Sequence, residues 1–106
     1  MREDSPLIKV AMQIILYAGD ARNHIEKALD HASAAEFELA EEFLVKAQDE
    51  INEAHKAQVD VIQAEMSGEE IEYCALFSHA QDTLMTIMSE LHVAKRLLDL
   101  YKKVNK

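Results

Sequence analysis

Residues that form turns are scarce in this sequence. Its 106 residues include two glycines and one proline, and there is no tryptophan. An all-β fold needs a turn about every 8–12 residues, and each turn draws mainly on glycine, proline and small polar residues. The scarcity therefore argues against an all-β fold and favours a few long helices.

Cysteine and long apolar runs are also nearly absent. The single cysteine, Cys74, cannot form an intrachain disulfide, which suits a reducing cytoplasm. No apolar run reaches the roughly 18 residues that a membrane-spanning helix needs, and no basic-then-apolar leader opens the chain. The sequence predicts a soluble cytoplasmic protein that does not insert into the membrane.

Positive charge is in short supply, with 11 basic residues against 20 acidic ones and a formal net charge of −9. Phosphate contacts to nucleic acid require a basic surface, so nucleic-acid binding is disfavoured. An acidic protein is instead steered toward a basic surface on its partner. The length suits a single domain, residues 1–106.

Apolar residues spaced alternately by three and four predict the first of three long helices. Ser5 and Pro6 are typical of a helix start, with serine as N-cap and proline at the first helical position. The predicted buried positions of this helix are Leu7, Ala11, Ile14, Ala18, Ala21, Ile25 and Ala28. The many small residues among them predict close approach by a neighbouring helix.

Two further helices follow. Ser33–Glu36 has the pattern of a capping box, and the helix after it should end near Met66–Gly68. Its predicted buried positions are Phe37, Ala40, Leu44, Ala47, Ile51, Ala54, Gln58 and Val61. The third helix is expected to begin around Glu69–Ile71, with acidic residues in its first turn. Its predicted buried positions are Tyr73, Phe77, Ala80, Leu84, Ile87, Leu91, Ala94, Leu98 and Tyr101.

Short connections between long helices predict an all-α fold, an up-down-up antiparallel three-helix bundle. Several apolar residues fall outside the predicted buried positions, namely Phe43, Val59, Ile62, Met85 and Met88. Exposed apolar surface of this extent marks an interface. We therefore expect the chain to self-associate.

The segment Ser78–Met88 holds the best candidates for chemistry. His79 and Asp82 are three residues apart on the third predicted helix, which places them about 60° apart around its axis. A neutral imidazole is a competent phosphoryl acceptor at cytoplasmic pH. Backbone N–H groups in mid-helix are already used, so side chains must help hold the phosphoryl group. The nearest local donor is Thr83.

Asp82 lies among small, uncharged side chains, which is typical of a packed contact. In a three-fold assembly, one Asp82 from each chain could converge on the axis, and three such carboxylates require a cation or a proton. Oxygen ligands of this kind suit magnesium or calcium.

Simpler interpretations remain open at this point. His79 can be an ordinary polar-face histidine on a helical adaptor without catalytic function. The other histidines, His24, His31, His55 and His92, are typical of surface or boundary positions. A third possibility is a metal-binding bundle in which Asp82 and the histidines are ligands.

The segments SHAQDTLM (78–85), INEAHKAQ (51–58), IQAEMSGEE (62–70) and AKRLLDLYKK (94–103) together resemble one family. It is the lactose/cellobiose-type IIA component of the bacterial phosphoenolpyruvate-dependent sugar phosphotransferase system. The resemblance covers nearly the whole chain.

The resemblance implies a phosphocarrier that assembles as a homotrimer of three-helix subunits. The histidine matching His79 accepts phosphate from phospho-HPr, as a tele-phosphohistidine, and passes it to the IIB component. The aspartate matching Asp82 binds a divalent cation, Mg²⁺, in the core of the trimer. Gln81 matches the motif as a supporting residue but is directed away from His79 on the same chain. Some lactose-type members carry a second histidine where this chain has Thr83, which favours a cellobiose, chitobiose or other β-glucoside system.

Overall fold

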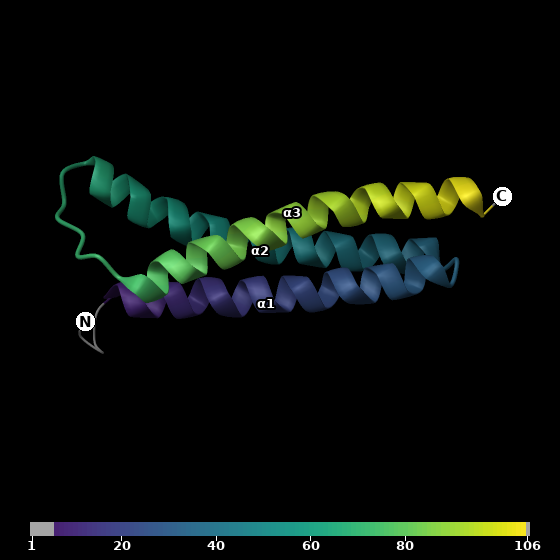
Figure 1. The fold of residues 1–106 in the computed structure, drawn as a ribbon, viewed down its shortest axis with the longest axis horizontal. Coiled ribbons are helices and arrows are strands. Elements are labelled where there is room, and N and C mark those ends of the chain that lie inside the picture. The colour runs from purple at the N-terminus through teal and green to yellow at the C-terminus, as the bar shows by residue number, and fades with distance from the viewer. Residues whose placement is uncertain (1–5, 106) are drawn as a thin grey trace.

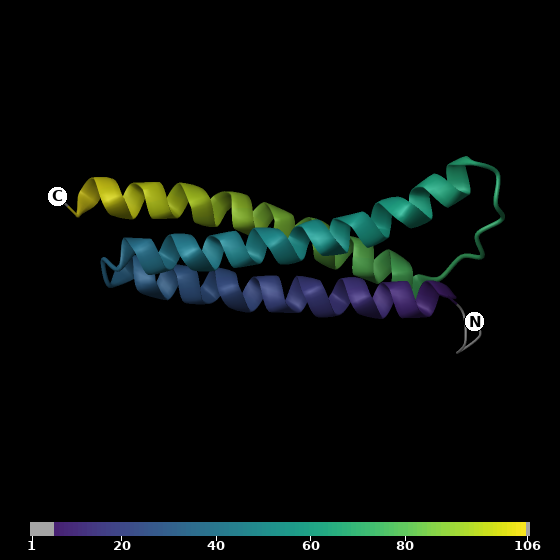
Figure 2. The ribbon, with the colours of Figure 1, turned by 180° about the vertical axis from the view of Figure 1, so that it is seen from behind.

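The computed structural model describes residues 6–105. In this part of the chain three α-helices, and no strands, follow one another: α1 (Pro6–Ser33), α2 (Phe37–Met66) and α3 (Ala75–Val104). α2 runs antiparallel to the other two, so α1 and α3 are parallel (Figures 1 and 2). The predicted up-down-up bundle is confirmed. Pro6 is the first residue of α1, whereas Ser5, its predicted N-cap, lies outside the described residues.

The core consists of one line of residues from each helix, at the predicted spacing of three and four. Large apolar side chains alternate with alanines, which lets the helices approach closely. The fully buried large residues are Ile14, Ile51, Leu84 and Ile87. Gln58 is the one buried polar side chain among the described residues. The predicted core positions are confirmed except at the helix ends, where Leu7, Phe37, Val61 and Tyr101 are only partly buried and Tyr73 is exposed.

Three stacked aromatic rings join α1 to α2 on a side of the bundle that α3 does not contact. Phe43 of α2 lies between the imidazoles of His24 and His31, with ring centroids 5.8 and 5.3 Å apart. Each imidazole also contacts a carboxylate, Glu50 for His24 and Glu36 for His31. The two histidines therefore lie at the boundary of the fold, as predicted.

The predicted capping box at the start of α2 is wrong. Ser33 is still helical, as the last residue of α1, and its hydroxyl donates to the carbonyl of Asp30 at 2.8 Å. Ala35 adopts a left-handed φ of 62°, and the Glu36 N–H donates back to the carbonyl of His31 at 2.9 Å. This backbone pattern is a Schellman motif that ends α1. Ser33 thus belongs to a helix end, and no side chain caps the start of α2.

α2 ends at Met66 as predicted, through the same motif. Gly68 takes φ 99°, its N–H donates to the carbonyl of Glu65 at 3.1 Å, and the Glu69 N–H donates to that of Ala64 at 3.2 Å. The predicted use of Gly68 as the left-handed residue is confirmed.

α3 begins at Ala75, so the predicted start at Glu69–Ile71 is wrong. Toward its end α2 diverges from α3, and residues 67–74 cross the gap without helical structure (Figure 1). Extended chain spans about 3.3 Å per residue against 1.5 Å in a helix, so an earlier helix start would leave too little chain for the crossing. Cys74, at φ −136° and ψ 110°, is still extended and is buried at the base of α3. Tyr73 consequently leaves the predicted core and is exposed.

Candidate functional site

His79 and Asp82 lie on the second and third turns of α3, on its exposed side. Their positions follow from the core residues between and after them. Ala80 and Leu84 are fully buried against the other helices, which turns His79 and Asp82 outward. The predicted pair is therefore brought to one surface, where an outside molecule can reach it.

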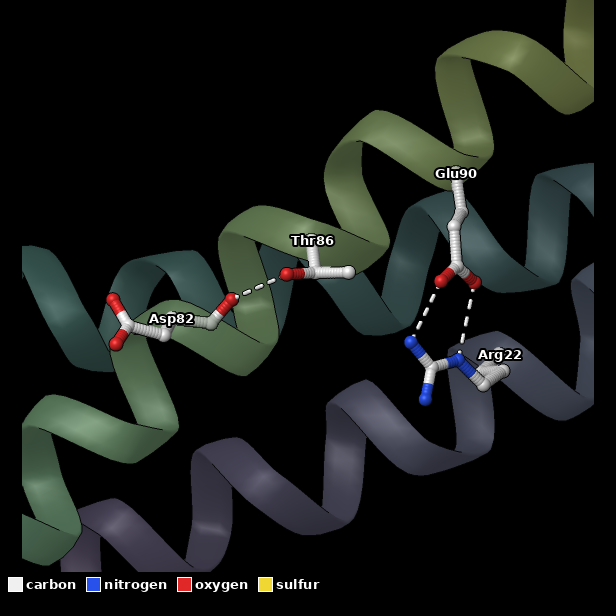
Figure 3. A network of polar contacts seen from close by, with 4 residues as sticks. All are labelled: Arg22, Asp82, Thr86 and Glu90. Atoms are coloured by element: carbon white, nitrogen blue, oxygen red, sulfur yellow. Dashed lines mark hydrogen bonds and ion pairs between the residues drawn. The ribbon is translucent and has the colours of Figure 1, made fainter.

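Two threonines bond the backbone of these two residues. Thr83 Oγ1 donates to the carbonyl of His79, and Thr86 Oγ1 donates to the carbonyl of Asp82, both at 2.9 Å (Figure 3 shows the second). A hydroxyl has one proton, so Thr83 must give up this bond before it can donate to a group on the imidazole. The spacing of four residues between Asp82 and Thr86 is the sequence signal for such a bond.

Gln81 does not join His79 within the chain. Two residues along a helix correspond to a turn of about 200°, and Gln81 is half-buried on the side of α3 that faces α2. There it lines a cavity of about 160 Å³, under the 67–74 crossing, together with Val61 and Phe77. The predicted direction of Gln81 is confirmed.

On the other side of α3, an ion pair joins it to α1. Arg22 Nη2 lies 2.6 Å from Glu90 Oε2, and Arg22 Nε donates to Glu90 Oε1 at 3.1 Å (Figure 3). The hydrogen bond and the charge of Glu90 raise the pKa of the Arg22 guanidinium above its ordinary value. The pair crosses a groove of about 710 Å³ between the helices, whose apolar lining includes Leu29, Val93 and Leu97. Nothing in the sequence pattern identified this pair, because its members are far apart in the chain.

A stripe along α3 extends from Asp82 toward the C-terminus. Its exposed members, spaced by three and four, are Asp82, Thr86, Ser89, Val93, Arg96, Leu100 and Val104. Leu100 is 55% exposed and Val104 is 72% exposed. Asp82 is the one carboxylate of the stripe, which otherwise consists of small or apolar side chains and Arg96. Such a face is typical of a helix that packs against another copy or partner.

Neither a metal site within one chain nor a membrane-spanning segment is found in residues 6–105. No three His, Cys, Asp or Glu side chains there are grouped so that they could hold a metal ion. No helix there has the length and apolar character needed to cross a bilayer. Within a single chain, Asp82 offers one carboxylate, which is too few ligands to hold a divalent cation.

Comparisons with known proteins agree on one family. Residues 9–102 match the lactose/cellobiose-specific IIA subunit of the PTS system. The lactose-specific EIIA component of Streptococcus mutans is 40% identical over 102 residues, which cover 96% of each chain. The cellobiose-specific enzyme IIA from Bacillus anthracis superposes with a TM-score of 0.89 at 39% identity, covering 94% of this chain and 92% of that one. IIA(chitobiose) of Escherichia coli, solved in complex with HPr, gives a TM-score of 0.83 at 27% identity, covering 96% and 99%.

Proposed function

The chain belongs to the lactose/cellobiose-specific IIA subunits of the phosphotransferase system, and from this premise we propose that it carries phosphate on His79. The observation that carries the proposal is the exposed imidazole of His79, which lies on a helix whose buried positions run from Phe77 to Leu98 and which is flanked by Asp82. In this role His79 accepts phosphate from phospho-HPr and passes it to the IIB component of a cellobiose-, chitobiose- or lactose-type permease.

The main contribution of the protein to this reaction is to position the imidazole of His79 in line with the donor's phosphoryl group. A ring nitrogen of neutral His79 attacks the phosphorus of the donor's phosphohistidine in line. One N–P bond forms while the donor's N–P bond breaks, and the donor imidazole leaves with the electron pair. The tele nitrogen, Nε2, is the acceptor that we assign. Thr83, after releasing the His79 carbonyl, supplies a hydroxyl donor on the same side of the helix.

We assign the stripe through Asp82 to the contact of a homotrimer. Three copies of the stripe would bring three Asp82 carboxylates to the axis, where a divalent cation of the Mg²⁺ class would offset two of their three negative charges. The donor set fits, because carboxylate oxygens are the ligands that Mg²⁺ prefers. Within its own chain Gln81 faces away from His79, so any support that it gives to the site comes across a subunit interface or through packing.

The partner assignment is supported by the chemistry and by one relative. The E. coli relative was solved with HPr bound. The net charge of −9 favours a donor with a basic docking surface.

The test is labelling with phosphoenolpyruvate, enzyme I and HPr, followed by detection of acid-labile phosphate on this protein. We expect the wild type to label and His79→Gln to remain unlabelled. The matched control is His92→Gln, which removes another exposed histidine of α3 and should label normally. Labelling of His79→Gln at the wild-type level would refute the assignment.

A further inference from the structure

Arg96 is an exposed cation of α3 that forms no ion pair with any residue of the described range, 6–105. Two other cations of the same helix do have partners. Lys95 Nζ donates to Gln48 Oε1 of α2 at 2.8 Å, and Lys102 pairs with Glu41 of α2. Both of these lysines lie on the side of α3 that packs against α2. Arg96 differs because it points away from the rest of its own chain.

The carboxylates closest to Arg96 along α3 are directed or engaged elsewhere. Asp99, three residues on, lines the groove between α2 and α3. Glu90, six residues back, is held by Arg22 at 2.6 Å. Leu98 is buried, and a step of two residues turns a helix by about 200°, so Arg96 faces the opposite way, toward solvent. The counter-ion of Arg96 therefore comes from outside the chain.

Arg96 lies in line with Asp82 on the exposed stripe of α3. Asp82, Ser89 and Arg96 are spaced by seven residues, which is the repeat of a seam between helices. A straight helix drifts by about 20° per heptad, so after two heptads Arg96 still points within about 40° of the direction of Asp82. At 1.5 Å per residue, the two residues are about 21 Å apart along α3. A symmetry axis that gathers three copies of Asp82 therefore gathers three copies of Arg96 two repeats further along.

We propose that three Arg96 guanidiniums on the trimer axis form a site for a tetrahedral oxyanion of the inorganic phosphate class. This inference rests on the trimer of the proposed function. Three like charges brought together require an anion, just as the three Asp82 carboxylates require a cation. A guanidinium presents two parallel N–H donors to a phosphate or sulfate group, and a tetrahedral anion has a three-fold axis of its own, so that one oxygen faces each arginine. Val93 and Leu100, to either side on the stripe, surround this layer with apolar side chains.

The experiment measures trimer formation of the full chain by sedimentation, with Mg²⁺ present and at constant ionic strength, in phosphate, sulfate or chloride. Phosphate and sulfate should raise the trimer association constant of the wild type by about tenfold at about ten times the dissociation constant of the site, whereas chloride should not. Arg96→Met should abolish this response, and without phosphate it should keep or raise the association constant, because three like charges are removed. Lys95→Met is the matched control. It removes the neighbouring cation that faces α2, and its response to phosphate should equal that of the wild type.

Equilibrium dialysis with labelled inorganic phosphate counts the sites. We expect one phosphate per three chains in the wild type and none in Arg96→Met. One phosphate per chain, an equal response to chloride, or a response that persists in Arg96→Met overturns the shared site. A wild type that forms trimers without any response to phosphate overturns this inference alone. A wild type that is monomeric in every anion is a different result, which refutes the proposed trimer and the anion site together.

Discussion

Arg22 on α1 and Glu90 on α3 form a two-pronged ion pair, with both carboxylate oxygens accepting from the same guanidinium (Figure 3). The pair lies two turns beyond Asp82 along α3 and links α3 to α1 across the groove between them. The rotation of α3 is set by its buried residues, such as Ala80 and Leu84, which also turn Asp82 outward.

A double-mutant cycle with Arg22→Gln and Glu90→Gln should give a coupling free energy of about 0.5 kcal/mol. The value is small because both side chains are more than a third exposed and are screened by water. Urea unfolding at low and high salt measures it, and the coupling should fall with salt. Because the pKa of Arg22 is raised, the stabilisation on the arginine side is fully present below the ordinary arginine pKa and is lost only as pH rises through the raised value. The coupling should therefore be the same at pH 7 and pH 10, and a drop between them would contradict the pair.

The Schellman motifs at the ends of α1 and α2 have different residues at the left-handed position, Ala35 in the first and Gly68 in the second. Ala35→Gly should raise the free energy of unfolding by about 0.5 kcal/mol, because it relieves the strain that a Cβ causes at positive φ. Gly68→Ala should lower it by about 1 kcal/mol for the same reason. Ala34→Gly, next to Ala35 but without a positive φ, is the control and should be destabilising. Equal effects of Ala35→Gly and Ala34→Gly would show that backbone strain is not the cause.

The stack of His24, Phe43 and His31 should carry a measurable share of the contact between α1 and α2. Phe43→Leu is expected to lower the free energy of unfolding by about 1–2 kcal/mol, through loss of ring stacking and of the contact with the Lys46 ammonium, 4.9 Å from the ring centroid. Chemical denaturation measures the loss. In a His31→Leu background the same substitution should cost less, whereas an equal cost would mean that the rings do not interact.

Asp82→Leu should keep or raise the stability of the proposed trimer, because it removes three buried like charges. Dissociation measured by sedimentation should depend on Mg²⁺ in the wild type and become independent of it in the variant. Asp99→Leu, another exposed aspartate of α3, should leave the Mg²⁺ dependence unchanged. Monomers of Asp82→Leu under conditions where the wild type is trimeric would argue against an axial position for Asp82.

The repeating positions of the core were predictable because helix packing depends on a short-range periodicity. Ala11 through Ala28, Ala40 through Gln58 and Phe77 through Leu98 all lie where a spacing of three and four places them. The same periodicity turned His79 and Asp82 outward. These features need only the geometry of one helix at a time.

The connections were harder to predict, because they depend on how the helices sit against one another. Ser33 matches a local capping pattern, but it is the last residue of α1, because the Schellman motif that ends this helix follows it. The acidic residues at 69–72 were expected to open α3, but the divergence of α2 required that stretch to span the gap instead. The pairing of Arg22 with Glu90 could not be predicted from the sequence either, since it depends on how two helices that are distant in the sequence are rotated against each other.

The crossing at residues 67–74 is the single covalent connection between two parts of the molecule. One is a helical hairpin of α1 and α2, and the other is a single helix that carries both His79 and Asp82. Packing of α3 against both α1 and α2 holds the two parts together, and Lys95 of α3 donates to Gln48 of α2 at 2.8 Å. Most of the crossing is exposed. Because one connection joins them, the hairpin and the helix can be supplied as separate peptides, which tests whether side-chain packing alone assembles the bundle. The side chains that we propose for phosphoryl transfer and metal binding, His79, Thr83 and Asp82, all lie on that one helix.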